Sequence, residues 1–228
     1  MTTRLCAVFV LAALSAAAGQ DLETARARQD RAALQSAVRQ LQSTAAGQPQ
    51  DAQAQYRLAL AESYLSEVTF QLRDKDAAAD AAETGIDAAN KAVALAPQVA
   101  EYHRMLGTLC GQTIPTHLLL AMKYGHCARD SVSRAIELDP RSAKAYVSRG
   151  VGNYYLPSAF GGGVDIAIRD FRKAIQLDPA SSDAHLWLGI ALRKSNRNAE
   201  AHTEIAKALA LDPNRIWAKQ QLDKTPAQ

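Results

Sequence analysis

Four segments of this chain end in proline and share one internal spacing. They cover residues 91–97, 134–140, 173–179 and 207–213. In each unit, small residues lie five and twelve positions before the proline, and another lies ten positions after the proline that precedes the unit. These small residues are Ala59, Gly85, Ala92, Gly107, Ala128, Ala135, Gly150, Ala167, Ala174, Gly189, Ala201 and Ala208. Helices approach to about 8–10 Å only where small side chains cross, and proline ends a helix. The spacing therefore predicts helical hairpins that stack into an all-α solenoid.

The last unit, residues 182–213, resembles the tetratricopeptide repeat family. Pro179 and Pro213 lie 34 residues apart, which is the period of that family. The residues on the family's motif positions are Leu188, Gly189, Ala201, Ala208 and Pro213. His185 stands where the family prefers tryptophan. The resemblance covers roughly residues 50–215 and implies a solenoid of about four helical hairpins with flanking N- and C-terminal helices.

The hairpins are predicted to shorten from the N-terminal to the C-terminal end, because all variation in spacing lies between the two helices of a unit. No glycine or proline interrupts the chain between Pro49 and Gly85. We therefore expect an elongated first hairpin with its turn at residues 73–76. Pro115 and Thr116 mark the turn of the second hairpin.

The third hairpin contains a glycine-rich insert with a second resemblance. Residues 155–171 look like an insert of some secreted bacterial repeat proteins, including the accessory T component of TRAP-type transporters. The residues that carry this resemblance are Tyr155, Pro157, Gly161, Gly162, Ala167 and Phe171. Gly163 stands where that insert has aspartate. The resemblance implies an oligomeric accessory subunit of a solute-uptake system; alternatively, Tyr155 and Phe160 only pin the loop to the core.

Residues 1–18 have the order of a secretory signal peptide. Arg4 precedes an apolar run at residues 5–14, and small residues follow it. The run is shorter than the roughly 20 residues that a membrane-spanning helix needs. We therefore expect cleavage near Gly19 or Gln20 and a periplasmic or secreted protein without a stable membrane anchor. A retained N-terminal anchor is the alternative.

Three further regions follow the predicted signal peptide. Residues 19–49 should contain a packing helix, over residues 22–46, that covers the first hairpin. Its expected buried stripe consists of Ala27, Leu34, Val38 and Leu41. Residues 50–214 should form the solenoid, and residues 215–228 a short capping helix and a tail.

Cys110 and Cys127 are the two cysteines outside the predicted signal peptide. They lie at similar separations from the turn of the second hairpin and could face each other across it. A disulfide there would contribute about 3 kcal/mol, and the alternative is two unpaired core residues. His117 and His126 lie nearby, but the spacing of these four residues fits no familiar zinc site. We expect no metal and no other cofactor.

The charges of the chain are nearly balanced, since 26 Lys and Arg face 23 Asp and Glu, for a formal net charge of +3. Nucleic-acid-binding proteins usually carry a clearly basic surface, so we expect no nucleic-acid partner. The sequence contains no nucleophile elbow, phosphate loop or paired-carboxylate motif. It therefore predicts a protein that is not an enzyme.

The tetratricopeptide resemblance implies that the first helix of each hairpin lines a concave groove. The residues that it places there are Tyr56, Leu60, Arg104, Thr108, Val147, Val151, Tyr154, Leu186, Ile190 and Arg193. Aromatic contact area and arginines that bind carboxylates suit an extended peptide or a partner helix. We therefore predict an interaction scaffold for an unidentified protein or peptide, with the oligomeric state left open. Val147, Val151 and Ile190 could instead only pack between adjacent helices.

Overall fold

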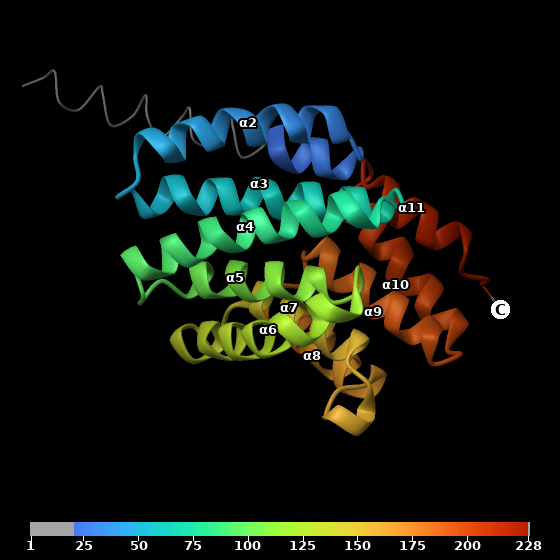
Figure 1. Cartoon of the computed structure of the whole chain (residues 1–228). Helices are drawn as coiled ribbons and strands as arrows, with labels where there is room; N and C mark the ends of the chain where they lie inside the picture. Colours follow the sequence, from blue (N-terminus) through green and yellow to red (C-terminus); the bar gives the residue numbers. More distant parts are fainter. Residues whose placement is uncertain (1–20, 228) are drawn as a thin grey trace, which may run out of the picture.

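The computed structural model describes residues 21–227, which form an all-helical solenoid (Figure 1). Its four hairpins are α3 (Ala52–Gln71) with α4 (Lys75–Leu95), α5 (Ala100–Thr113) with α6 (Leu118–Leu138), α7 (Ala143–Tyr155) with α8 (Val164–Leu177), and α9 (Ser182–Lys194) with α10 (Asn198–Leu211). Helix α2 (Arg31–Gly47) precedes them, and α11 (Ile216–Asp223) follows them. The predicted fold class, a helical-hairpin solenoid with flanking helices, is confirmed.

The two helices of a hairpin touch where the repeat places its small residues. A Cβ atom added at Gly189 would lie 2.9 Å from the carbonyl oxygen of Ala201 and would collide with Ile205. A Cβ atom added at Gly150 would lie 2.8 Å from Cδ1 of Phe171. Such distances are shorter than a carbon–carbon contact of about 3.5–4.0 Å. Glycine is therefore required at these crossings.

The first hairpin is elongated as predicted, with 20 residues in α3 and 21 in α4. Its turn contains Arg73 at φ 68° and Asp74 as the N-cap of α4. The Asp74 carboxylate accepts a hydrogen bond from the Ala77 amide at 3.1 Å. The turn thus lies at residues 72–74, one residue earlier than the start of the predicted 73–76, and Lys75 and Asp76 already belong to α4. In the second hairpin the extra length lies in α6, which has 21 residues against 14 in α5.

The third hairpin has the predicted loop between its helices. A short 3-10 helix, η1 (Ser158–Phe160), is followed by Gly161 at φ 84°, a left-handed conformation that glycine adopts without strain. The Tyr155 ring lies 6.3 Å from that of Trp187, whereas Phe160 is 75% exposed. Tyr155 therefore packs on the core, and Phe160 does not pin the loop to it.

The prediction of one continuous helix over residues 22–46 is wrong. Residues 21–27 form a separate helical segment that ends before α2. Gln29 adopts φ 52°, and the Asp30 carboxylate caps α2 by accepting a hydrogen bond from the Ala33 amide at 2.9 Å. A side-chain cap and one left-handed residue thus break the helix without glycine or proline.

The expected buried stripe of this region is divided between the two segments. Leu34 and Val38 are buried on α2, where Leu41 is partly buried, and Ala27 is buried on the preceding segment. Helix α2 packs against α3, as expected for a helix that covers the first hairpin.

The predicted signal peptide at residues 1–18 lies outside the described residues. Among the helices between residues 21 and 227, none combines the length and the hydropathy of a membrane-spanning segment.

Candidate functional site

The first helices of the four hairpins, α3, α5, α7 and α9, contact one another in sequence order and form the concave face of the solenoid. The second helices, α4, α6, α8 and α10, form the convex face. All ten residues that we predicted to line the groove lie on the four helices of the concave face. Their surroundings differ from one end of the face to the other.

Three of the predicted residues join one polar network between α3, α5 and α7. The Tyr56 hydroxyl donates to Glu101 at 2.8 Å, and Arg104 Nε donates to the other oxygen of that carboxylate at 2.7 Å. The Thr108 hydroxyl lies 2.8 Å from the hydroxyl of Ser148 on α7. Burial opposes the charge on Glu101, but the hydrogen bonds from Arg104 and Tyr56 outweigh it and hold the pKa of this carboxyl below its ordinary value. The Arg104 side chain is 11% exposed, so its charge is committed to Glu101.

Four predicted residues are partly buried and keep some surface on the concave face. Val147, Val151 and Tyr154 border a hydrophobic cluster between α7, α8 and α9. The ring of Tyr154 lies 5.8 Å from that of Trp187, and burial raises the pKa of the Tyr154 phenol. Leu60 has a similar position on α3, against the core of the first hairpins.

The last three predicted residues contact the chain's own C-terminal segment. Leu186 and Ile190 are 0% and 5% exposed and belong to one hydrophobic cluster with α11. Arg193 donates hydrogen bonds to the Gln221 carbonyl at 3.0 Å and to the Thr225 hydroxyl at 2.7 Å. Ile190 therefore packs between helices, which was the alternative to its predicted place in the groove lining.

The structure adds an element that the sequence analysis did not place on this face: the helical segment at residues 21–27. Leu22 and Ala25 are buried at 6% and 7% exposure. The Arg26 guanidinium lies over the ring of Tyr64 on α3, at 4.9 Å from the ring centre. The concave face thus holds a short helix that belongs to the same chain.

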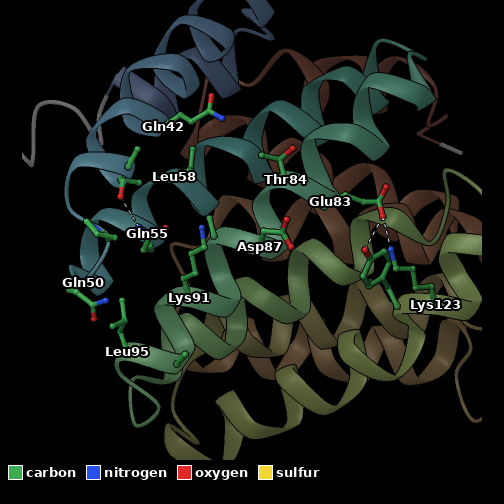
Figure 2. A pocket seen from close by; sticks show the side chains of 16 residues that line it. Gln42, Gln50, Gln55, Leu58, Glu83, Thr84, Asp87, Lys91, Leu95 and Lys123 are labelled. Carbon is green, nitrogen blue, oxygen red and sulfur yellow. Dashed lines mark hydrogen bonds and ion pairs between the residues drawn. The ribbon is translucent and has the colours of Figure 1, made fainter.

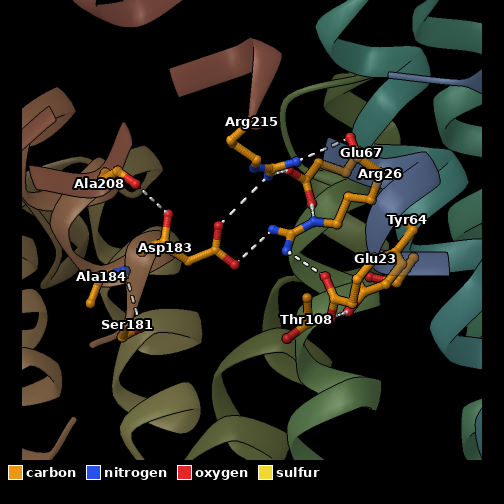
Figure 3. A network of polar contacts seen from close by, with 12 residues as sticks. Glu23, Arg26, Tyr64, Glu67, Thr108, Ser181, Asp183, Ala184, Ala208 and Arg215 are labelled. Carbon is orange, nitrogen blue, oxygen red and sulfur yellow. Dashed lines mark hydrogen bonds and ion pairs between the residues drawn. The ribbon is translucent and has the colours of Figure 1, made fainter. Parts of the chain in front are cut away.

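Four charged side chains fasten this segment to both ends of the solenoid (Figure 3). Arg26 Nε donates to Glu67 on α3 at 2.7 Å, and its Nη2 donates to Asp183 on α9 at 2.8 Å. Arg215, at the start of α11, contacts Glu67 and lies 3.6 Å from Asp183. Burial opposes the charges on both carboxylates, but the two arginines hold the pKa values of Glu67 and Asp183 below their ordinary values.

The sequence contained a signal for the two carboxylates but none for the two arginines. Glu67 and Asp183 continue the inward-facing stripes of α3 and α9 at helical spacing, so both could have been added to the predicted groove. Arg26 and Arg215 lie outside the hairpins, and no spacing rule connects them to this face.

A hollow outside the concave face lies between α2, the start of α3, α4 and α6 (Figure 2), with a volume of about 970 Å³. Its polar lining includes Gln42, Gln55, Glu83, Asp87, Lys91 and Lys123. Lys123 Nζ lies 3.1 Å from Glu83, and Gln55 Nε2 donates to the carbonyl of Ala45 at 3.0 Å. Several of these groups therefore already pair with one another or with the backbone, as the polar groups of the concave face do.

In the second hairpin, the Sγ atoms of Cys110 and Cys127 lie 1.95 Å apart and join α5 to α6. The two Cα atoms are 5.9 Å apart, within the usual range for a disulfide. His117 lies 3.1 Å from Asp76 of the first hairpin. Within residues 21–227, no three His, Cys, Asp or Glu side chains are grouped as a metal site requires.

Comparison with protein families connects this architecture to known proteins. The sequence profile of the family described as Regulator of microtubule dynamics protein 1-3 matches residues 20–157, which is more than half of the chain. The chain belongs to this family. A tetratricopeptide repeat profile matches residues 165–222, and the predicted repeat family is thereby confirmed. The first match extends from the N-terminal segment to α7, and the second extends from α8 through the last hairpin to α11.

Among solved structures, this family member is similar to TTC0263, a tetratricopeptide protein of Thermus thermophilus. The identity is 18% and the TM-score 0.59, over 85% of this chain and 90% of that one. It is also similar to MamA 41-end from Desulfovibrio magneticus RS-1, at 18% identity and a TM-score of 0.47, over 87% of this chain and 96% of that one. The first likeness shows the fold alone. A comparison with curated proteins gave no match.

Neither family description names a transporter subunit. The resemblance of residues 155–171 to a TRAP accessory component therefore stays a prediction.

Proposed function

We propose that this protein is a non-catalytic scaffold that binds a peptide or a helix of another protein on its concave face. The tetratricopeptide architecture supports a role in protein interaction, because stacked repeats create an extended concave surface. The observation that carries the finer proposal is the helical segment at residues 21–27, which lies on this face with an apolar side buried. A helix laid into a groove by its apolar side is a general mode of recognition.

The partly buried side chains of the concave face suit a further contact. Leu60, Val147, Val151 and Tyr154 are partly buried, so a partner could complete their burial. Aromatic residues such as Tyr154 contribute a large contact area and are enriched among residues that dominate binding. Arg104 is less suited to a free contact, because it is already paired with Glu101.

Affinity capture of the native partner tests this proposal. The double variant Leu60→Ala/Tyr154→Ala removes two partly buried side chains and leaves every ion pair of the face in place. Important contact residues cost more than about 1 kcal/mol each on truncation, so affinity should fall about tenfold or more. Met122→Ala on the convex helix α6, where Met122 is 74% exposed, is the control and should bind normally. Equal capture by the wild type and both variants would contradict the proposal.

The periplasmic or secreted location is also part of this proposal. It rests on the order of charged, apolar and small residues in residues 1–18. The mass of the intact native protein should correspond to a start near Gly19 or Gln20. A mass that begins at Met1 would refute cleavage of a signal peptide and favour the retained anchor.

Two alternatives have their own tests. The family description makes microtubules a partner to examine, by co-sedimentation with polymerised tubulin, and the match over residues 20–157 favours this test.

The accessory-subunit alternative predicts a defined oligomer and thermal stabilisation by a small solute, and it rests on residues 155–171 alone.

A further inference from the structure

The helical segment at residues 21–27 depends on the concave face for its structure. Isolated helices shorter than about 12 residues are marginal in water, and this segment has only about two turns. The turn at Gln29 joins it to α2, whose own N-cap is Asp30. A backbone rotation at this turn would therefore release the segment and leave α2 capped.

The polar contacts of the segment place one cation between two carboxylates. Arg26 contacts Glu67 from one end of the solenoid and Asp183 from the other. Arg215 supplies the second cation, and its side chain is 2% exposed. The two guanidinium groups meet the two carboxylates of the solenoid, and Arg26 also lies 3.5 Å from the more exposed Glu23 of its own segment (Figure 3).

Departure of the segment would leave Glu67 and Asp183 with one cation instead of two. Glu67 and Asp183 would keep Arg215 as their shared cation, since it belongs to the C-terminal part of the fold, and would lose Arg26. Both carboxylates are partly buried, with side chains 20% and 32% exposed, and a charge in such a position is less favourable when it loses one of its cations. The vacated face would therefore favour an incoming ligand that replaces both the apolar contact and the positive charge.

We infer that residues 21–27 are a displaceable ligand of the concave face within the same chain, and that the partner that displaces them is a helix that presents an arginine to Glu67 and Asp183. This inference rests on the proposed function, and it names the chemistry of the partner. The segment also defines the pattern: its buried apolar residues are Leu22, Ala25 and Ala27, at four and one positions before Arg26 and one position after it.

Arginine suits this position better than lysine. Arg26 uses two different nitrogens, Nε and Nη2, to reach Glu67 and Asp183 on two different helices. A planar guanidinium holds these donors in a fixed arrangement, whereas a lysine ammonium is a single point charge. The geometry therefore selects a partner by its arginine as well as by its apolar side.

Binding of a synthetic peptide to the full chain tests this inference directly. The probe is a fluorescent peptide with the sequence of residues 20–30, and the receptor is the full chain with Arg26→Ala, which weakens the internal docking. We expect the peptide to bind this variant about tenfold tighter than the wild type, because the wild-type face is occupied by a tethered segment at millimolar effective concentration. The same peptide with Arg26→Ala should bind the variant about tenfold more weakly than the unchanged peptide.

A second receptor keeps the test decisive if Arg26→Ala does not fold. Leu22→Ser retains all four charges and weakens the internal docking through its apolar contact, so it should also bind the peptide more tightly than the wild type. The inference is overturned if the folded variants do not bind at about 1 mM peptide, or if the two peptides bind equally. It is also overturned if neither variant folds, because residues 21–27 are then a permanent part of the fold.

The peptide assay is independent of the capture experiment with Leu60→Ala/Tyr154→Ala. If native partner capture is unaffected by that double variant while the peptide binds as expected, the proposed function fails and the internal ligand remains. If capture depends on the concave face while the peptide does not bind, only the present inference fails.

Discussion

Replacement of Glu62 by glutamine should stabilise the protein at alkaline pH and have little effect at acid pH. Glu62 lies on α3 where this helix crosses α4. A Cβ atom added to Gly85 of α4 would lie only 2.9 Å from the Cβ atom of Glu62. The residue is 4% exposed. Burial raises the pKa of this carboxyl from 4.5 to about 7, because a charge is less well solvated there than in water.

The sign and the size of the effect follow from this pKa. The folded protein binds the Glu62 proton more tightly than the unfolded chain, so stability falls as pH rises from about 4.5 to about 7. The charge of Glu62 therefore does not destabilise the folded protein below about pH 4.5, and it destabilises the protein fully above about pH 7. A pKa rise from 4.5 to about 7 corresponds to about 3 kcal/mol in the free energy of unfolding. Water that reaches the carboxylate reduces the cost, and we expect about 1–3 kcal/mol.

Urea unfolding of Glu62→Gln and the wild type, at about pH 4.5 and about pH 8, measures this effect. The variant should be more stable by about 1–3 kcal/mol at the higher pH and nearly equal to the wild type at the lower pH. Glu137→Gln is the control, because the Glu137 side chain is 64% exposed, and it should differ little from the wild type at either pH. A stability difference that is the same at both pH values would refute the reasoning.

Further predictions concern the helix crossings and the cysteines. Gly189→Ala should lower the free energy of unfolding by about 1–3 kcal/mol, because its Cβ would lie 2.9 Å from the carbonyl oxygen of Ala201. Gly111→Ala should raise the free energy of unfolding by up to about 1 kcal/mol, because no atom lies within 4 Å of the added Cβ. Equal urea midpoints for the two variants would contradict the assigned crossing. Maleimide should label neither Cys110 nor Cys127 in denatured, unreduced native protein, and two labelled thiols would rule out the disulfide.

The stacking of the hairpins could be predicted from the sequence because short-range chemistry determines it. Residues such as Gly189 and Ala201 are required where two helices cross, so their spacing reveals each hairpin. The approximate position of the first turn, observed at residues 72–74, follows from the lack of earlier helix breakers. The break before α2 could not be predicted in this way, because Gln29 and Asp30 produce it through a left-handed backbone and a side-chain cap.

The concave face could be predicted only in part. The tetratricopeptide resemblance placed all ten candidate residues on the first helices, but it does not show what covers them. Leu186 and Ile190 are buried because α11 packs back on the last hairpin. The contact between Arg26 and Asp183 joins residues 157 positions apart, and it depends on curvature that accumulates over four hairpins. No spacing within one helix contains that information.

Photo-crosslinking in native cells tests most directly whether another protein binds the concave face. A photoreactive amino acid is placed at Leu60 on the concave face and, in a second variant, at Met122 on the convex face, where the native side chain is 74% exposed. The proposed function predicts a covalent adduct with a discrete partner from position 60 and none from position 122. An adduct that forms from position 122 and not from position 60 would contradict it.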